Sequence, residues 1–247
     1  MDLDDRQTGR VLTRREVLAV LGVSGASLFV GCRAAQSSAA PRSAVGAIPG
    51  CVVRPEQTEG PYFVDEMLNR SDLRSDPSDG SIRPGTPLAL TLVVSRLSGN
   101  ACTPLKDIQV DLWQCDHEGV YSDVQDPSFN MKGKKFLRGF QMTDSQGRAQ
   151  FTTIYPGWYR GRTVHIHFKL RSRAAPGAGF AFTSQLYFDD ALTDKVFAAA
   201  PYASRGPRST RNERDGIFRR NGSELILAPI PSGSGYSATF PVALQGV

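Results

Sequence analysis

The 247-residue sequence has only three histidines and four cysteines, and it lacks helix-length amphipathic runs. None of the cysteine spacings resembles a zinc site. The longest apolar stretch, Val17–Val30, is too short and too rich in small residues for a comfortable membrane span. The basic residues are dispersed, without the aromatic-basic interleaving of a nucleic-acid module, so the net charge of +5 does not predict a nucleic acid partner.

The first 31 residues are predicted to be an export signal. Arg14 and Arg15 precede the apolar stretch in an arrangement typical of twin-arginine export, which carries folded proteins. Gly31-Cys32 resembles a lipoprotein cleavage site, so Cys32 is the lipidation candidate, and the protein would be secreted or tethered to the cell surface. A single uncleaved membrane anchor is the alternative. Residues 32–50 have the composition of a flexible tether, and residues 51–247 suit one domain.

The domain is dense in Gly and Pro and shows short segments with a period of two, which predict strands. The predicted strands cover residues 87–95, 107–114, 138–143, 148–154, 163–171, 183–188, 224–228 and 236–243. A short helix is expected over residues 189–199, and Asp144 to Gly147 predicts a turn. This pattern indicates an all-β sandwich of short, mostly antiparallel strands with long loops.

Two of the three histidines, His165 and His167, stand one residue apart in the predicted strand. Alternate side chains of a strand share a face, so both imidazoles and Lys169 would project from one side. The residues expected to face the core on the other side are Val164, Ile166, Phe168 and Leu170. The histidine face could therefore bind a metal while the same strand contributes to the core.

Two turns upstream each bring a tyrosine shortly after a glycine, at Tyr121 and at Tyr159. Tyr155 competes with Tyr159 as a ligand, but it precedes the Pro-Gly turn and is expected to pack instead. Two phenolate oxygens and two neutral imidazoles suit Fe(III) better than zinc or copper. Two tyrosinates and a hydroxide balance the charge of ferric iron, so the surrounding protein needs to compensate little.

These segments resemble the intradiol ring-cleavage dioxygenases, the catechol, hydroxyquinol and protocatechuate dioxygenases, and in particular a smaller exported branch. The resemblance runs from about Pro55 to Phe188. The matching segments are Leu112–Tyr121, Pro156–Tyr159, Arg162 with the His165-Ile-His167 triplet, Thr183–Phe188 with Gln185, and the loop Thr58–Phe63. The family's Pro-Ala after the arginine is replaced here by Thr163-Val164, which affects no ligand.

The resemblance implies a prealbumin-like β-sandwich that cleaves a small aromatic diol with O2 between its hydroxyl-bearing carbons, giving a cis,cis-muconate. Non-haem Fe(III) would be bound by Tyr121, Tyr159, His165 and His167. Tyr159 would also accept a substrate proton, Arg162 would stabilise negative charge on the ring, and Gln185 would orient the substrate. Pro61 and Tyr62 would line the pocket. Such an oxidoreductase would serve aromatic compound catabolism.

Two other classes of protein share part of this pattern. A cupin-type oxygenase also has an H-x-H strand, but it requires a glutamate four or five residues after the second histidine. Arg171 and Ser172 occupy those positions here. A non-catalytic exported β-sandwich that binds carbohydrate or aromatic ligands has no need of the complete ligand set. Cys102 and Cys115 flank a turn and a strand, which favours them as a disulfide. The sequence is compatible with several catechols as substrate and with a homodimer.

Overall fold

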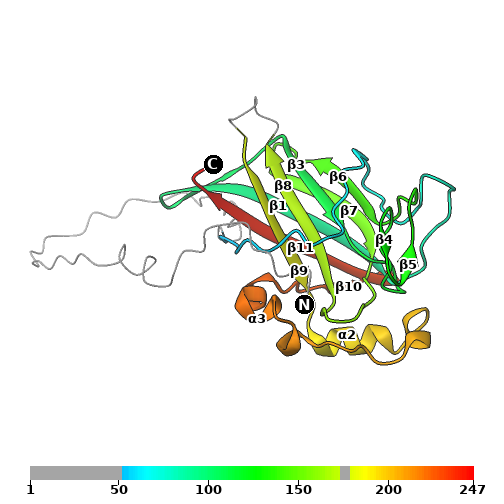
Figure 1. The fold of residues 1–247 in the computed structure, drawn as a ribbon. Helices are drawn as coiled ribbons and strands as arrows, with labels where there is room; N and C mark the ends of the chain where they lie inside the picture. The colour runs from blue at the N-terminus through cyan, green and yellow to red at the C-terminus, as the bar shows by residue number, and fades with distance from the viewer. Residues whose placement is uncertain (1–51, 173–178) are drawn as a thin grey trace, which may run out of the picture. The chain divides into compact units, whose positions relative to one another are not determined.

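The computed structural model describes residues 52–172 and 179–247. The predicted signal segment, the tether and Cys32 therefore lie outside the described residues. Within the described ranges, no helix is both long enough and apolar enough to cross a membrane. The described chain folds into two sheets and a small hairpin, with short helices beside them (Figure 1).

The first sheet is built around a long strand, β1 (Pro87–Ser98). Its other members are β2 (Ala101–Pro104), β7 (Arg148–Ile154), β10 (Ile230–Ser232) and β11 (Gly235–Gln245). The strand order is β10-β11-β1-β2, and β7 pairs with the first part of β1, antiparallel from Pro87 to Val93. β1 and β11 run parallel over ten residue pairs, from the pair Leu88–Tyr236 onward, although they come from opposite ends of the domain.

The second sheet carries the histidine strand. It has the order β6-β3-β8-β9, and all three pairings are antiparallel. The bounds are β3 (Ile108–Trp113), β6 (Arg138–Met142), β8 (His165–Ser172) and β9 (Ala181–Tyr187). The register places Trp113 of β3 and Gln185 of β9 on either side of His167. Residues far apart in sequence thus meet around the two histidines.

The main hydrophobic core takes side chains from both sheets. β1 contributes Leu88, Leu90, Leu92 and Val94, and β8 contributes Ile166, Phe168 and Leu170, all almost completely buried. The ring of Phe168 lies 6.3 Å from that of Phe240 in β11, so the two sheets are in contact at this point. The predicted division of β8 into an apolar face and a histidine face is confirmed, because a period of two fixes which side chains enter the core.

Short elements flank the sheets. β4 (Gln125–Asp126) and β5 (Phe129–Asn130) form a separate hairpin. Helix α2 (Asp190–Phe197) begins at Asp189, whose side chain accepts a hydrogen bond from the Leu192 backbone N–H, a common N-cap arrangement. After it come η2 (Tyr202–Arg205), η3 (Asn212–Arg214), α3 (Phe218–Asn221) and η4 (Gly222–Leu225). Figure 1 shows α2 and α3 together on one side of the strands.

The predicted all-β sandwich is confirmed, while some of its details differ. The predicted strand over residues 224–228 is wrong: the chain there ends helix η4 and makes a single bridge from Ile226 to Tyr187. Its apolar residues suggested a strand, but Leu225 and Leu227 are buried from a helical turn and an extended link. The parallel pairing of β1 with β11 was also not anticipated, since periodicity does not specify a partner.

Candidate metal centre

The two tyrosine turns are pressed against each other through their glycines. Gly119 has a φ of +79°, and a Cβ there would lie 2.2 Å from the Trp158 carbonyl oxygen. A Cβ on Gly157 would lie 2.4 Å from the Asp116 carbonyl oxygen, to which the Gly157 N–H donates at 3.0 Å. Only glycine permits both approaches. The glycine before each tyrosine therefore brings the two turns, and the tyrosines that follow them, together.

Strand β8 presents both histidines to the same side. His165 and His167 are 2% and 1% exposed. The indole of Trp113 stacks on the His167 imidazole, with ring centroids 4.9 Å apart and planes 7° from parallel. The Thr163 carbonyl lies 2.7 Å from His165 Nδ1, and because a carbonyl can only accept, Nδ1 carries the proton and Nε2 presents its lone pair. The backbone before β8 thus fixes the tautomer of His165.

The polar ends of the four predicted ligands converge. His165 Nε2 lies 3.0 Å from His167 Nε2 and 3.2 Å from Tyr159 Oη. The ring of Tyr121 lies 5.8 Å from that of Tyr159 and 6.3 Å from that of His167. Donor atoms about 3 Å apart can share one ion bound at roughly 2 Å. The structure therefore brings together the residues that the sequence selected from three separate segments.

The protonation states of these groups fit a cation. Burial lowers the pKa of both histidines well below the usual value, with the Arg162 charge adding to the effect at His165 and the neighbouring His165 adding to it at His167, so both imidazoles are neutral. Burial, and secondarily the neighbouring Tyr159, raises the pKa of Tyr121. The Tyr121 hydroxyl is also buried without a hydrogen-bond partner among the described residues. A bound cation would satisfy this oxygen and favour its phenolate.

Hard oxygen donors together with neutral imidazoles match ferric iron. The donor set therefore fits Fe(III), and Tyr121, Tyr159, His165 and His167 are the residues that would hold it. Among the described residues, no three His, Cys, Asp or Glu side chains are grouped so that they could hold a metal ion.

The structure distinguishes Tyr155 from Tyr159 as the candidate ligand of the second turn. Tyr155 is completely buried and packs on Phe188, with ring centroids 4.2 Å apart. Its hydroxyl lies 2.7 Å from Thr193 Oγ1, and the Thr193 hydroxyl donates to the Asp189 carbonyl, so Tyr155 is the donor. Tyr155 therefore supports helix α2, and Tyr159 is the tyrosine that faces the histidines.

Arg162 and Gln185 lie beside the histidines and are bonded to each other. Arg162 is 3% exposed, and its Nη2 donates to Gln185 Oε1 at 2.5 Å. Gln185 Nε2 in turn donates to the carbonyl of Thr58, in the predicted pocket loop, at 3.0 Å. A buried guanidinium with a defined direction can stabilise negative charge that develops close by. Because Gln185 pairs with His167 in the sheet, the bond between the two side chains places Arg162 near the histidine strand.

The pocket loop covers the tyrosines with one aromatic ring. Tyr62 stacks on Tyr121, with ring centroids 4.6 Å apart, and meets the edge of the Tyr159 ring at 6.1 Å. The Tyr62 hydroxyl donates to Asp126 of β4 at 2.8 Å. Pro61 is exposed in the turn before it. Tyr62 thus lies in direct contact with the predicted ligands, and Pro61 lies at the rim.

The predicted disulfide between Cys102 and Cys115 is wrong. Cys102 is disulfide-bonded, but Cys115 is a free thiol, 2% exposed, whose Sγ lies 3.6 Å from the Gly157 carbonyl. The two cysteines belong to different sheets, because β2 lies in the first sheet and Cys115 follows β3 of the second. Burial raises the pKa of the Cys115 thiol, which keeps it protonated beside the tyrosine turns.

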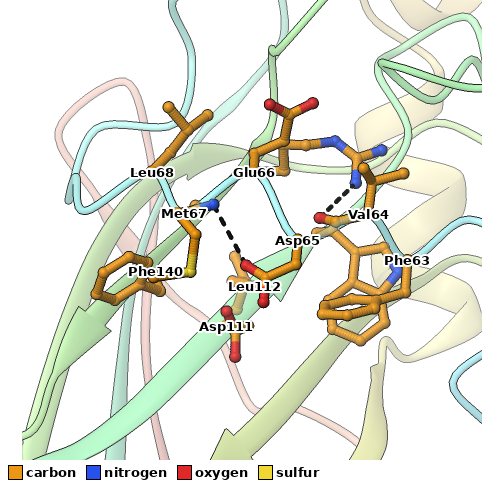
Figure 2. A pocket seen from close by; sticks show the side chains of 12 residues that line it. Phe63, Val64, Asp65, Glu66, Met67, Leu68, Asp111, Leu112 and Phe140 are labelled. Atoms are coloured by element: carbon orange, nitrogen blue, oxygen red, sulfur yellow. Dashed lines mark hydrogen bonds between the residues drawn. The ribbon is translucent and has the colours of Figure 1, made fainter.

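A separate small hollow lies between the segment Phe63–Leu68 and strands β3 and β6. Figure 2 shows Met67 and Phe140 at one end of it and Phe63 at the other. Its acidic residues are already paired, for example Asp65 with Arg171 at 2.7 Å. Trp113 contributes to its lining and separates it from His167. It is therefore distinct from the space around the four donors.

Sequence reasoning missed several residues that shape the centre. The sequence indicates no role for Trp113, which stacks on His167, or for Asp126, which accepts the hydrogen bond of Tyr62. Asp215 is completely buried and accepts a hydrogen bond from Arg162 Nε at 2.9 Å. In the sequence, its surroundings are distinguished only by several arginines. No motif spacing links Asp215 to residues fifty positions earlier. Only the packing of η3 and α3 against the end of β9 reveals this link.

Comparisons with known proteins agree with this geometry. The family model described as dioxygenase matches residues 58–214. The chain is 32% identical over 157 residues to the protocatechuate 3,4-dioxygenase beta chain of Burkholderia cepacia, which covers 59% of this chain and 65% of that protein. It is 30% identical over 146 residues to catechol 1,2-dioxygenase 2 of Acinetobacter lwoffii, covering 50% and 47%. The chain thus spans about two thirds and about half the length of these curated relatives.

A solved structure is similar over nearly its whole length. The intradiol ring-cleavage dioxygenase from Tetranychus urticae superposes with a TM-score of 0.70 at 31% sequence identity. The match covers 80% of this chain and 96% of that chain. The range matched by the family model, residues 58–214, includes the segments that carry the four converging side chains.

Proposed function

Because the chain belongs to the intradiol ring-cleavage dioxygenase family, we propose that it is a non-haem Fe(III) enzyme that opens a catechol ring. The ring would be cleaved with O2 between the two hydroxyl-bearing carbons, giving a cis,cis-muconate-type product. The single observation that carries this proposal is the convergence of two phenols and two neutral imidazoles, with His165 Nε2 3.0 Å from His167 Nε2 and 3.2 Å from Tyr159 Oη.

The chemistry that ferric iron supplies when bound is that of a Lewis acid, which favours the catecholate and makes its ring carbons reactive toward O2. Tyr159 is the half-buried ligand candidate, whereas Tyr121 is completely buried. Tyr159 Oη is therefore the atom that we assign as acceptor of a substrate proton. Arg162 stabilises negative charge on the ring, and Gln185, bonded to it, helps orient the substrate.

The aromatic residues around the centre define its walls. Tyr62 stacks on Tyr121, and Trp113 stacks on His167. The rings of Tyr121 and His167 are therefore each shielded from water on one face. Low local dielectric strengthens the interaction of Arg162 with an anionic substrate. Among the relatives, one is named for protocatechuate and another for catechol. We propose a small aromatic diol as the substrate class, with both of these as first candidates.

The proposal is tested on purified protein reconstituted with ferric iron. A ferric tyrosinate site absorbs visible light strongly, so the protein should be red-brown. Oxygen uptake is then measured across catechol, protocatechuate and hydroxyquinol, and the product is identified by mass spectrometry and ultraviolet absorption. A colourless protein that stays inert after reconstitution would defeat the proposal and favour a non-catalytic binding module.

A matched pair of histidine variants sharpens this test. His165→Ala should lose iron and colour, because it removes one converging donor. His117→Ala should keep both, since His117 lies edge-on to Tyr202, with ring centroids 6.3 Å apart, and takes no part in the donor set. Equal loss of iron in the two variants would show that the histidine assignment is wrong.

We further propose that the protein is exported by the twin-arginine route and that Cys32 carries lipid. The support is the Arg14-Arg15 pair before the apolar stretch and the Gly31-Cys32 dipeptide. The disulfide at Cys102 is also typical of an oxidising compartment. Replacing both arginines with lysine should retain the protein in the cytoplasm, as measured by cell fractionation. Export of that variant at the parental rate would contradict the proposal.

A further inference from the structure

Asp215 lies between η3 and α3 and carries a buried carboxylate near the candidate centre. It is completely buried, and it accepts four hydrogen bonds. Its Oδ1 accepts from the backbone N–H groups of Ile217 and Phe218 at 2.8 and 2.9 Å. Its Oδ2 accepts from Arg162 Nε at 2.9 Å and from the Thr163 N–H at 2.8 Å. The two oxygens therefore serve two different parts of the chain.

The Oδ1 contacts are local, because they reach the N–H groups two and three residues ahead in the turn that leads into α3. Such a turn needs one acceptor oxygen, which serine or asparagine supplies as well as aspartate. The Oδ2 contacts reach across more than fifty residues to the segment directly before β8. A buried charge is costly unless a partner compensates it, and Arg162 supplies the opposite charge here. The need for a charged carboxylate at position 215 therefore comes from Arg162 and not from the turn before α3.

The contact with Arg162 fixes the direction of the guanidinium. With Nε bound to Asp215, the planar group presents Nη2 to Gln185 Oε1 at 2.5 Å. Gln185 continues the chain of bonds to the pocket loop through the Thr58 carbonyl at 3.0 Å. One hydrogen-bonded series thus joins the C-terminal helical segment, the arginine, strand β9 and the loop over the tyrosines.

The contact with Thr163 reaches a predicted metal ligand. The Thr163 N–H donates to Asp215, and the Thr163 carbonyl accepts from His165 Nδ1 at 2.7 Å. The Thr163 hydroxyl forms a second tie to the same segment, at 2.6 Å from Asn212 Oδ1. Asn212 in turn donates to the Phe188 carbonyl at 2.8 Å. The segment Asn212–Phe218 therefore anchors the backbone that orients His165.

We infer that Asp215 is a positioning residue of this centre: it holds the Arg162 guanidinium toward the substrate space and steadies the Thr163 peptide that orients His165. This inference rests on the proposed function for its catalytic consequence, whereas the ion pair itself can be tested without turnover. Partners that orient the groups at a reactive centre typically change activity by about 10- to 100-fold when they are removed.

The first test is Asp215→Asn. The amide keeps an oxygen for Ile217 and Phe218, but its NH2 group then faces two other donors, Arg162 Nε and the Thr163 N–H. We expect kcat to fall about 10- to 100-fold, with KM changed much less and the visible colour retained. Asp194→Asn is the matched control, because Asp194 also pairs with arginines, Arg208 and Arg211, but its own carboxylate is exposed on α2. Parental kcat in Asp215→Asn would overturn the inference.

The second test uses Arg162→Ala and needs no catalysis. This variant leaves the Asp215 carboxylate beside a space the shape of a guanidinium. Millimolar guanidinium should raise the midpoint of its thermal unfolding relative to equal tetramethylammonium, which has the same charge but no N–H donors. The parent protein should show no such difference, because its own arginine occupies the space. Equal midpoints in the two salts would overturn the inference.

The two tests separate the failure of this inference from failure of the proposed function. If the parent protein opens no catechol, the guanidinium measurement on Arg162→Ala still decides whether Asp215 forms a specific guanidinium site. If Asp215→Asn does not fold, the same measurement decides the question without it. Where both variants fold, adding Asp215→Asn to Arg162→Ala should reduce kcat by a smaller factor than Asp215→Asn does in the parent protein, because the contact with Arg162 is already lost and only the contact with Thr163 remains.

Discussion

Two tyrosines four residues apart, Tyr155 and Tyr159, provide the sharpest test of the candidate metal centre. Each can be changed to phenylalanine, which removes a single oxygen and leaves the ring. Tyr155 Oη donates to Thr193 Oγ1 at 2.7 Å inside the core, whereas Tyr159 Oη lies 3.2 Å from His165 Nε2. The same chemical change should therefore affect stability at one position and iron binding at the other.

The magnitudes follow from these contacts. A buried hydrogen bond contributes about 0.5–1.5 kcal/mol net, so Tyr155→Phe should lower the free energy of unfolding by about 1 kcal/mol. The cost stays moderate because the Thr193 hydroxyl still donates to the Asp189 carbonyl. For a domain of this size, that loss corresponds to a fall of about 2–4 °C in the melting midpoint. Tyr159 is half-buried, and its replacement should leave the stability of iron-free protein nearly unchanged.

The assay combines two measurements on the same two variants. Thermal unfolding of the iron-free proteins reports stability, and the visible spectrum and iron content after ferric reconstitution report the centre. We expect Tyr155→Phe to be coloured and less stable, and Tyr159→Phe to be stable with an altered spectrum and slower turnover. If Tyr155→Phe lost the colour while Tyr159→Phe matched the parent in spectrum and rate, the second ligand would be Tyr155 and our reasoning would be refuted.

Three further changes test other parts of the argument. Tyr121→Phe should fold but lose iron and colour, because it removes the one phenol oxygen that is completely buried without a hydrogen-bond partner in the described chain. Metal analysis and absorbance measure this loss, and full iron content would contradict the assignment of Tyr121 as a ligand. Arg162→Ala should keep the colour and lower kcat by about 100-fold, as expected for a preorganised charge-stabilising donor, and unchanged kcat would show that its role is misplaced. Phe168→Ala should cost about 3–5 kcal/mol in urea unfolding, because its fully buried ring contacts Phe182 and Phe240 between the sheets. A cost below about 1 kcal/mol there would mean that the core is loosely packed at this point.

The histidine strand shows how far local sequence reasoning reaches. A period of two assigns every side chain of β8 to a face, and the structure places Ile166, Phe168 and Leu170 in the core as predicted. The glycine before each tyrosine was equally visible in the sequence. The reason for these glycines was not visible in the sequence, because the carbonyl that forbids a Cβ at Gly157 belongs to Asp116, on the other turn. The spacing of glycine and tyrosine in the sequence identified the two turns, and the packing of one turn against the other explains why each needs its glycine.

The cysteines and the predicted strand over residues 224–228 show where that reasoning fails. Cys102 and Cys115 are close in sequence, but Cys102 is disulfide-bonded while Cys115 is a buried free thiol, so the two do not pair. The apolar residues of 224–228 are buried as a strand would bury them, although the backbone is helical at Gly222–Leu225. In both cases a local pattern was compatible with more than one long-range arrangement.

The sequence by itself determined the sandwich class, the two-faced histidine strand and the identity of the four candidate ligands, because these depend on periodicity and on the chemistry of short motifs. Only the tertiary structure decided that Tyr159 faces the histidines while Tyr155 supports α2, and that Asp215 holds Arg162. The physical reason is that a hydrogen-bond partner fifty residues away is chosen by strand register and by the packing of separate elements, which no local pattern specifies.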